Sequence, residues 1–465
     1  MSAVHPYIPN SNPEIRRKML SEIDLELIDE LFRDIPTSIQ EKAKLSIPSH
    51  LSEMEARKYV EALLAKNQSS RDLLSFLGAG VWSHHVPAAI DSVISRGEFL
   101  TSYTPYQPEI SQGTLQSLFE YQSLICDLTE MDYANSSLYD WSTALGEAAR
   151  MSVRVTGRDE FIVPHFIHPE RLGTLKTYCE PAEIRLVEVA QDSRTGAVDL
   201  SDLRRKVSDH TAGVYLEMPS FLGFMEESCD QIADITHGNG SLFVVGFEPT
   251  SLGVFKSPGE LKADIAVGEG QPLGNHMNYG GPLLGIFACR GEALLRNMPG
   301  RIIGKTTTLD GQQEAYCMAL QTREQHIRRG KATSNICTNE ALLSLAAAMY
   351  VSLLGPSGMK DLAITIAERT RYAIEELSKL RGVKAPGFDA FHYMEFTVNF
   401  NQTGKKVSQI NEALLSAGIQ GGLDLSKRFP ELGQSALYCV TEVHSHRDID
   451  MLRDELRVIL EAQPN

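Results

Sequence analysis

A cluster of basic residues has the densest concentration of anion-binding side chains in this chain. The nine positions from 323 to 331 of an otherwise acidic protein include five of them: Arg323, His326, Arg328, Arg329 and Lys331. Asn335 and several Ser and Thr residues follow, ahead of a very apolar segment. Guanidinium and ammonium groups at this density suit a carboxylate, a phosphate or an acidic partner surface. A solvated basic face followed by a helix cap explains the same pattern, so both interpretations stay open.

A second candidate is the turn that contains Ser142 and Thr143, which leads into a segment with the spacing of an amphipathic helix. Free backbone N–H groups at a helix N-terminus, with hydroxyl groups beside them, form an anion site that suits a phosphate. Ser and Thr also cap helices where nothing is bound. On pattern alone the simple cap is the commoner case, and a phosphate site is the alternative.

The third candidate is the segment GEGQPLGNHMNYGGPLLG, residues 268–285, which lies between two short apolar runs. In open parallel sheets, ligands bind outside the carboxyl ends of the strands. Polar side chains in the segment, such as Asn275 and His276, exceed what a tight turn needs, although glycine alone could serve turns here. The segment contains no lysine, serine or cysteine. It therefore predicts a ligand loop without an obvious nucleophile.

The composition excludes several classes of function. Forty-four basic and 60 acidic residues give a formal charge of -16, which argues against a general binder of nucleic acid or anionic membranes. The first residues have no signal-peptide pattern, and no stretch approaches the ~20 uninterrupted apolar residues of a membrane helix. Seven scattered cysteines without a CxxC motif indicate reduced thiols. We expect a cytoplasmic protein without a metal site.

Three regions of the chain position these side chains. Residues 1–70 are predicted to form a helical N-terminal extension. Residues 71–337 alternate short strands, apolar on both faces, with helices, which indicates a large α/β domain with a mostly parallel sheet. Residues 338–465 read as helices alternating with two strands, which predicts a small C-terminal α+β domain.

Long motifs make the chain resemble a known family. They are YTPYQPEISQGTLQSLFEYQSLICDLTEM, GEGQPLGNHMNYGGPLLGIFACR and TREQHIRRGKATSNICTNEALLSLAAAMY. The chain resembles glycine dehydrogenase (decarboxylating) subunit 1, the alpha subunits of the split P-protein of the glycine cleavage system. The resemblance runs from His5 to near the C-terminus. It implies the fold type I architecture of pyridoxal-phosphate-dependent transferases, which agrees with the regions above.

The resemblance also implies a reaction and partners. The family's enzyme decarboxylates glycine with pyridoxal phosphate and transfers the remaining aminomethyl group to the lipoyl arm of the H-protein. In split systems a beta subunit (subunit 2) supplies the lysine that binds the cofactor covalently, and the two chains form an α2β2 tetramer. We therefore expect this chain to be inactive alone and to hold no pyridoxal phosphate of its own.

The missing nucleophile fits this resemblance. Glu248 stands where the fold places the acid that pairs with the pyridine nitrogen, and Gln271-Pro272 stands where it places the lysine. Neither glutamine nor proline can form a Schiff base. Ser142, Thr143, His168 and Glu248 are therefore candidates for a relic cofactor site. Trp141 departs from the family pattern, which has a small residue beside the phosphate cradle, and Glu248 replaces the usual aspartate.

Other residues are candidates for contact with a partner or an anion. Four of them lie in or next to the TPYQPE segment: Tyr103, Tyr106, Gln107 and Glu109. The others are the five basic residues from Arg323 to Lys331 named above, together with Asn335. Two competing hypotheses remain at this point. One is a self-sufficient pyridoxal-phosphate enzyme that uses Lys331 as its Schiff-base lysine. The other is a non-catalytic structural or regulatory homologue.

Overall fold

A computed structural model describes residues 4–5, 7–43 and 46–462 of the chain. The chain divides into two compact units, residues 1–68 and residues 69–465. The first unit is helical, as predicted, and Glu55 and Ser52 form the capping box that begins its longest helix. Its helices are η1 (Pro9–Ser11), α1 (Pro13–Ser21), η2 (Ile28–Phe32), α2 (Thr37–Lys42) and α3 (Glu53–Leu64).

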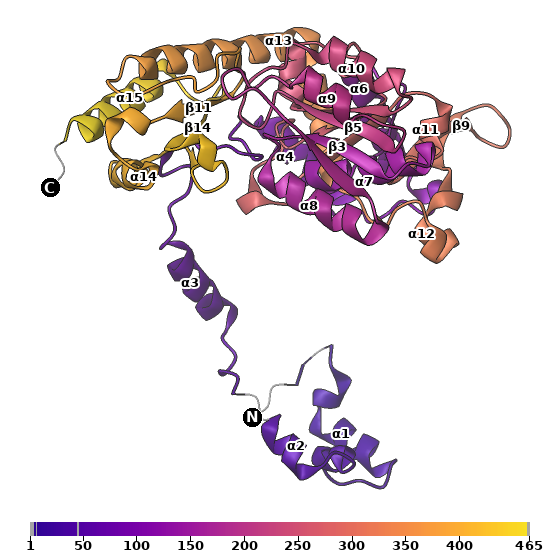
Figure 1. The fold of residues 1–465 in the computed structure, drawn as a ribbon. Helices are drawn as coiled ribbons and strands as arrows, with labels where there is room; N and C mark the ends of the chain where they lie inside the picture. The colour runs from indigo at the N-terminus through magenta and orange to yellow at the C-terminus, as the bar shows by residue number, and fades with distance from the viewer. Residues whose placement is uncertain (1–3, 6, 44–45, 463–465) are drawn as a thin grey trace. The chain divides into compact units, whose positions relative to one another are not determined.

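A seven-stranded sheet with the order β2-β8-β7-β6-β5-β3-β4 forms the centre of the second unit (Figure 1). The short apolar runs predicted as strands within residues 71–337 lie in this sheet, and β8 runs antiparallel to β7 and β2. Their side chains are buried on both faces except along the edge strand β4, as expected for a sheet covered by helices. The strands are β2 (Tyr133–Ala134), β3 (Glu160–Pro164), β4 (Arg185–Val189), β5 (Thr211–Met218), β6 (Leu242–Phe247), β7 (Ile265–Glu269) and β8 (Gly285–Cys289).

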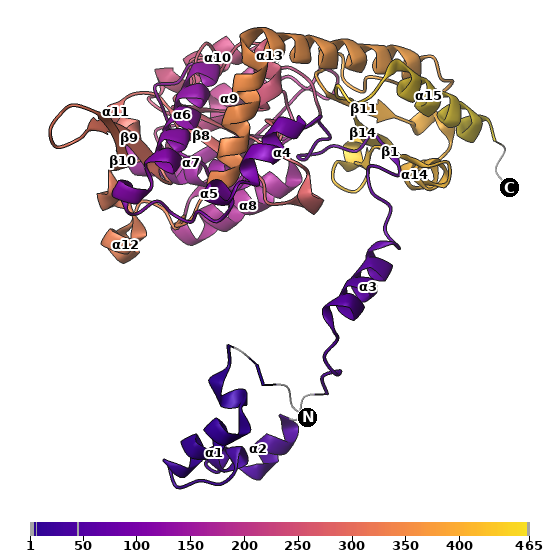
Figure 2. The ribbon, with the colours of Figure 1, turned by 180° about the vertical axis from the view of Figure 1, so that it is seen from behind.

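Helices cover the two faces of this sheet (Figures 1 and 2). Helices α7 (Trp141–Thr156) and α8 (Pro169–Cys179) contribute Ala144, Ala148 and Leu175 to the hydrophobic core on one face. The core on the other face includes residues of α6 (Gln112–Thr129), α9 (Leu200–Lys206), α10 (Cys229–Gly238) and the first half of α13 (Ala341–Ser378). Because α8, α9 and α10 connect parallel strands, the carboxyl ends of these strands lie at one edge of the sheet, where the predicted cofactor site lies.

The C-terminal part of the second unit has its own sheet of order β11-β14-β13 and its own apolar core. Helix α13 reaches the C-terminal part after a break at Gly355, which has a φ of 60° and is followed by Pro356. The first strand after residue 70 also joins this part, because β1 pairs with β12. The elements are β1 (Leu74–Ser75), β11 (Glu395–Asn399), α14 (Val407–Ser416), β12 (Ile419–Gln420), β13 (Leu423–Asp424), β14 (Ser435–Cys439) and α15 (His446–Glu461). The domain bounds expected from the sequence remain a prediction.

A β-hairpin and several short helices complete the second unit. The hairpin of β9 (Ile302–Thr307) and β10 (Glu314–Ala319) was not predicted from the sequence, because its polar ends lack the pattern of a buried strand. The short helices are α4 (Ala88–Ile94), α5 (Gly97–Leu100), η3 (Pro108–Ile110), η4 (Glu180–Ala182), η5 (Pro249–Gly253), η6 (Asn278–Gly280), α11 (Glu292–Leu295), η7 (Gln321–Arg323), α12 (Gln325–Arg328), η8 (Arg329–Lys331), η9 (Asn401–Thr403) and η10 (Pro430–Leu432).

Two properties of the described residues concern membrane insertion and metal binding. One helix, α13, is long and apolar enough to cross a membrane by composition alone. Ala346, Ala347 and Tyr350 in its first half are buried in the core beneath the sheet, which is the environment of a core helix. No three His, Cys, Asp or Glu side chains within residues 4–5, 7–43 and 46–462 are grouped to hold a metal ion.

Candidate functional site

The residues expected to cradle a phosphate form a closed helix cap instead. Asp140 is the N-cap of α7, and its carboxylate accepts a hydrogen bond from the backbone N–H of Thr143 at 2.7 Å. The Thr143 hydroxyl in turn accepts from the backbone N–H of Asp140 at 3.2 Å. This reciprocal arrangement is a capping box, which satisfies the groups that would otherwise bind an anion. Ser142 is half-buried beside it.

The side chain of Trp141 occupies the interior next to this cap. Its indole N–H donates to the Tyr215 hydroxyl at 3.0 Å, and that hydroxyl donates to Glu217 at 3.1 Å. The guanidinium of Arg171 lies 3.4 Å from the centre of the indole ring and 3.1 Å from the Glu217 carboxylate. All four side chains are buried. The indole is therefore held by a hydrogen bond, a buried ion pair and a cation–π contact.

Gly246 on β6 makes room for the indole. A Cβ atom at this position would lie 2.7 Å from Trp141 Cζ2 and would collide with the Tyr215 hydroxyl. Glycine in the middle of a strand weakens the strand and marks a close approach of another group. The unusual glycine in the apolar run LFVVGF is thus explained by the tryptophan that packs against it.

Glu248 is buried at the expected place, just after β6, but its carboxylate is already used. It accepts hydrogen bonds from the Thr250 N–H at 2.9 Å, the Thr250 hydroxyl at 2.7 Å and the Ser251 N–H at 2.9 Å. The carboxylate thereby caps the short helix η5. Burial raises the pKa of Glu248, and the nearby His84 opposes that rise.

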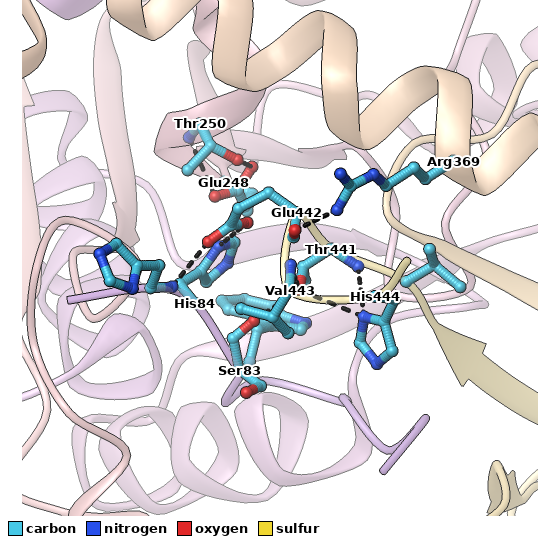
Figure 3. A network of polar contacts seen from close by, with 12 residues as sticks. Ser83, His84, Glu248, Thr250, Arg369, Thr441, Glu442, Val443 and His444 are labelled. Carbon is cyan, nitrogen blue, oxygen red and sulfur yellow. Dashed lines mark hydrogen bonds and ion pairs between the residues drawn. The ribbon is translucent and has the colours of Figure 1, made fainter. Parts of the chain in front are cut away.

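A polar network continues from Glu248 toward the C-terminal part (Figure 3). His84 Nδ1 lies 2.8 Å from a Glu442 carboxylate oxygen, and Arg369 of α13 donates to the backbone carbonyl of Glu442. Burial lowers the pKa of His84, but Glu442 and then Glu248 outweigh that effect, so the pKa is raised. The contact between His84 and Glu442 therefore links the segment before α4 to the loop after β14.

Gln271, which the sequence predicts at the position of the Schiff-base lysine, uses both ends of its amide in structural hydrogen bonds. The carbonyl oxygen accepts from the Trp82 N–H at 3.0 Å, and the NH2 group donates to the carbonyls of Trp82 at 3.1 Å and Asn275 at 2.9 Å. Pro272, beside it, is buried. The loop therefore fastens the segment around Trp82 to the end of β7, and it holds no lysine or cysteine.

His168 is the N-cap of α8 and is also engaged. Its Nε2 donates to the Ala79 carbonyl at 2.9 Å, and its Nδ1 accepts from the Glu170 N–H at 3.1 Å. Burial lowers the pKa of His168 to about 3, and the Arg171 charge adds to the effect. The imidazole is therefore neutral, and its ring makes an edge-to-face contact with Phe221.

These residues do not fit pyridoxal phosphate. The cavity that remains among them has a volume of about 10 Å³ and is lined by both tryptophans of the chain, Trp82 and Trp141, with Arg171 and Glu248. A space of this size holds at most about one water molecule. At the predicted phosphate site, Asp140 and Thr143 form a capping box. At the predicted acid position, Glu248 caps a short helix. At the predicted lysine position the residue is Gln271. The region in which the sequence predicts a relic cofactor site is packed with side chains.

A second cluster unites the candidates of the TPYQPE segment with the region after the basic cluster. Arg301, which is buried, donates to the Thr104 hydroxyl at 2.8 Å and to the Tyr106 hydroxyl at 3.0 Å. It also donates to the Asn339 side-chain oxygen at 3.4 Å. The Tyr103 hydroxyl lies 3.0 Å from that of Thr338. Residues more than 190 positions apart in sequence thus meet at one surface.

The basic cluster divides between this surface and the interior. His326 packs its ring at an angle against Tyr106, with centroids 5.9 Å apart, while Arg328 and Lys331 are exposed. Arg323 is buried, and its guanidinium donates to the backbone carbonyls of Leu320, Met298 and Gly300. Arg323 thus joins its own segment to residues 298–300, and its buried guanidinium is not available for contact with a partner.

The remaining candidates of both segments lie at the surface. Gln107 and Glu109 are exposed beside Tyr106, and Arg329 and Asn335 are exposed farther along the basic cluster. Sequence reasoning did not identify Arg301, the residue that organises the cluster. It stands alone in the run MPGRIIGK, and no spacing pattern connects it to Tyr106, so no signal in this sequence could have singled it out.

The sheet, its helices and the position of the closed pocket define a class of protein. This is the fold type I architecture of pyridoxal-phosphate-dependent enzymes, in a chain whose side chains fill the predicted cofactor region. A glutamate decarboxylase of Lactobacillus brevis shares the fold with a TM-score of 0.68 at 14% identity, over 95% of this chain and 98% of that one.

Comparison with closer relatives identifies the family. The model of the glycine cleavage system P-protein family matches residues 5–456, so the chain belongs to that family. A probable glycine dehydrogenase (decarboxylating) subunit 1 of Staphylothermus marinus is 50% identical over 464 residues, 98% of each chain. One of Pyrococcus furiosus is 48% identical over 457 residues, 98% of this chain and 99% of that one.

A solved structure of the family supports the fold directly. It is a crystal structure of glycine decarboxylase (P-protein) of the glycine cleavage system in inhibitor-bound form. It matches with a TM-score of 0.87 at 36% identity, over 98% of this chain and 100% of that chain. The resemblance and the fold class that the sequence suggested are both confirmed.

Proposed function

We propose that this chain is the subunit of a two-subunit glycine dehydrogenase (decarboxylating) that does not bind the cofactor. A second subunit supplies the lysine and binds pyridoxal phosphate covalently, and the two form an α2β2 assembly. The substrate is glycine, and the aminomethyl group passes to the lipoyl arm of the H-protein. The observation that carries the proposal is the filled pocket in a chain 50% identical to a subunit 1 over its length.

In this proposal the chain contributes a surface to the second subunit's site. The cluster around Arg301 is the surface that the structure favours, because polar and apolar side chains gather there. Leu100, Tyr103 and Ile110 are large and exposed, with 80% of Ile110 accessible to solvent. Exposed apolar groups rimmed by charge are typical of protein–protein interfaces. Arg301 fixes Tyr106 from the inside, so the surface is held in one arrangement before a partner arrives.

The setting follows from the family as well. Bacterial and archaeal relatives of the glycine cleavage system work on small soluble substrates, and the acidic composition gives this chain no attraction to nucleic acid or anionic lipid. We therefore place the protein in the cytoplasm.

The hypothesis of a self-sufficient enzyme has less support. Lys331 is exposed at the end of η8 and lines no part of the closed pocket. An exposed lysine lacks the hydrophobic pocket that activates a Schiff-base lysine. A purely structural or regulatory homologue is the other alternative, and it predicts that the second subunit is fully active without this chain.

One experiment separates the three hypotheses. The chain and its second subunit are purified alone and together, pyridoxal phosphate is added, and glycine–bicarbonate exchange is measured. Our proposal predicts exchange in the mixture and none in either chain alone. Exchange by this chain alone that is abolished in Lys331→Ala would establish the self-sufficient enzyme. Full exchange by the second subunit alone would establish the structural homologue.

The surface is tested by substitution, with assembly of the two subunits measured by sedimentation velocity. Tyr106→Ala removes the ring that Arg301 and His326 contact, and we expect weaker assembly with the second subunit. Phe391→Ala removes an exposed aromatic ring of the C-terminal part and serves as the control. Equal assembly by both variants would remove this surface from the proposal.

A further inference from the structure

A polar cavity lies outside both sites described above. Its volume is about 450 Å³, and its walls come from α7, the end of α8 and residues 325–335. Cavities of roughly 300–1,000 Å³ are the size of small-molecule sites. Hydroxyl and amide side chains line much of it, including Thr177, Thr333 and Gln325. The closed pocket at the start of α7 has no part in it.

Two arginines give this cavity a net positive charge. Arg150 and Arg329 both line it, and within residues 46–462 neither pairs with a carboxylate. Arg150 donates only a long hydrogen bond of 3.4 Å, to the Tyr178 carbonyl. The one acidic group in the lining, Glu147, is held by the Ser334 hydroxyl at 2.7 Å and faces the charge of Arg154 as well as that of Arg150.

The walls of the cavity are fixed on both sides. Gly146 lets the Tyr178 ring approach α7, since a Cβ atom at this position would lie 2.6 Å from the ring. On the other side, the Thr333 N–H donates to the Arg323 carbonyl at 3.0 Å, and Arg154 donates to the Thr333 carbonyl at 2.8 Å. The segment that carries Arg329 is therefore anchored at Arg323 and Thr333, which preorganises the space.

We propose that this cavity binds a small organic anion whose phosphate or carboxylate groups pair with Arg150 and Arg329. Planar guanidinium groups bind both kinds of oxyanion through paired, charge-assisted hydrogen bonds. The hydroxyl and amide groups around them supply further donors to the same oxygens. The site needs neither the second subunit nor the cofactor, so it stands or falls independently of the function proposed above.

The test is calorimetric titration of the full chain at low ionic strength with two probes, inorganic pyrophosphate and citrate. Binding by one probe only distinguishes a phosphate from a carboxylate ligand. Arg150→Ala and Arg329→Ala should each lower the affinity for the probe that binds by at least about tenfold, the loss expected for one charge-assisted hydrogen bond. The double variant should bind neither probe.

Arg204→Ala is the matched control, because Arg204 is an exposed arginine of α9 outside the cavity. It removes the same charge and should leave the affinity unchanged. Thermal unfolding of the free variants checks that each one is folded. Failure of both probes to bind the parent chain would overturn the proposal. Affinity in the double variant equal to that of the Arg204 control would also overturn it, because the anions would then respond only to net charge.

Discussion

Replacement of Trp141 by alanine tests whether the indole fills the place of a cofactor. The change removes about 140 Å³ of side chain, and at roughly 24 cal/mol per Å³ of cavity the cost is about 3.4 kcal/mol. The Tyr215 hydroxyl also loses its hydrogen-bond donor, and Arg171 loses the ring 3.4 Å away. We expect a total loss of about 3–5 kcal/mol, the range observed for buried aromatic residues.

Urea unfolding followed by circular dichroism measures this loss as a shift of the midpoint at constant slope. Trp141→Phe is the matched variant: its ring refills most of the space but cannot donate to Tyr215, so it should lose less than the alanine variant. A loss below about 1 kcal/mol in Trp141→Ala would refute the reasoning, because the indole would then not be packed in a closed core.

Three further predictions follow from the same structure. Gly246→Ala should destabilise the chain by about 1–3 kcal/mol through overpacking. The double variant with Trp141→Ala should lose less stability than the sum of the two single variants, because both substitutions act at one contact. Additive losses of stability in urea unfolding would contradict this contact. Burial raises the pKa of Glu395 to about 7. Because the pKa is raised in the folded chain, the contribution of Glu395 to the free energy of unfolding is fully present below the pKa of about 4.3 that it has in the unfolded chain. This contribution is lost as the pH rises through 7. Unfolding midpoints between pH 5.5 and 8.5 should therefore fall more steeply in the parent chain than in Glu395→Gln, and identical slopes would exclude Glu395 as the cause. Arg301→Ala should weaken assembly with the second subunit by at least about tenfold, because Tyr106 loses its internal anchor; sedimentation velocity of the mixture measures this, and an unchanged assembly would show that Arg301 serves only the fold.

The sequence predicted the sheet well because its strands are buried on both faces. Runs such as LFVVGF and LLGIFA are apolar without alternation, and β6 and β8 follow directly from them. The positions of Glu248 and Gln271 were predictable for the same reason, since the two residues follow consecutive strands of one sheet. The hairpin of β9 and β10 was not, because its outer half is polar and exposed.

The chemistry of the closed pocket needed the structure. The sequence marks Trp141 as a departure from its family, but only the structure connects it to Gly246, Tyr215 and Arg171, which lie from 30 to 105 positions away. The basic cluster shows the opposite limit. Arg323 looked like its neighbours in the sequence, yet three backbone carbonyls hold it in the interior. Long-range packing decides both cases, and one sequence carries no local signal of it.

The location of the cofactor is the most direct test of the whole account. Pyridoxal phosphate is added to the assembled subunits and to this chain alone, the imine is reduced with borohydride, and the labelled peptide is found by mass spectrometry. We predict a label on one lysine of the second subunit and none on this chain in either sample. A stoichiometric label on any lysine of this chain would contradict the account.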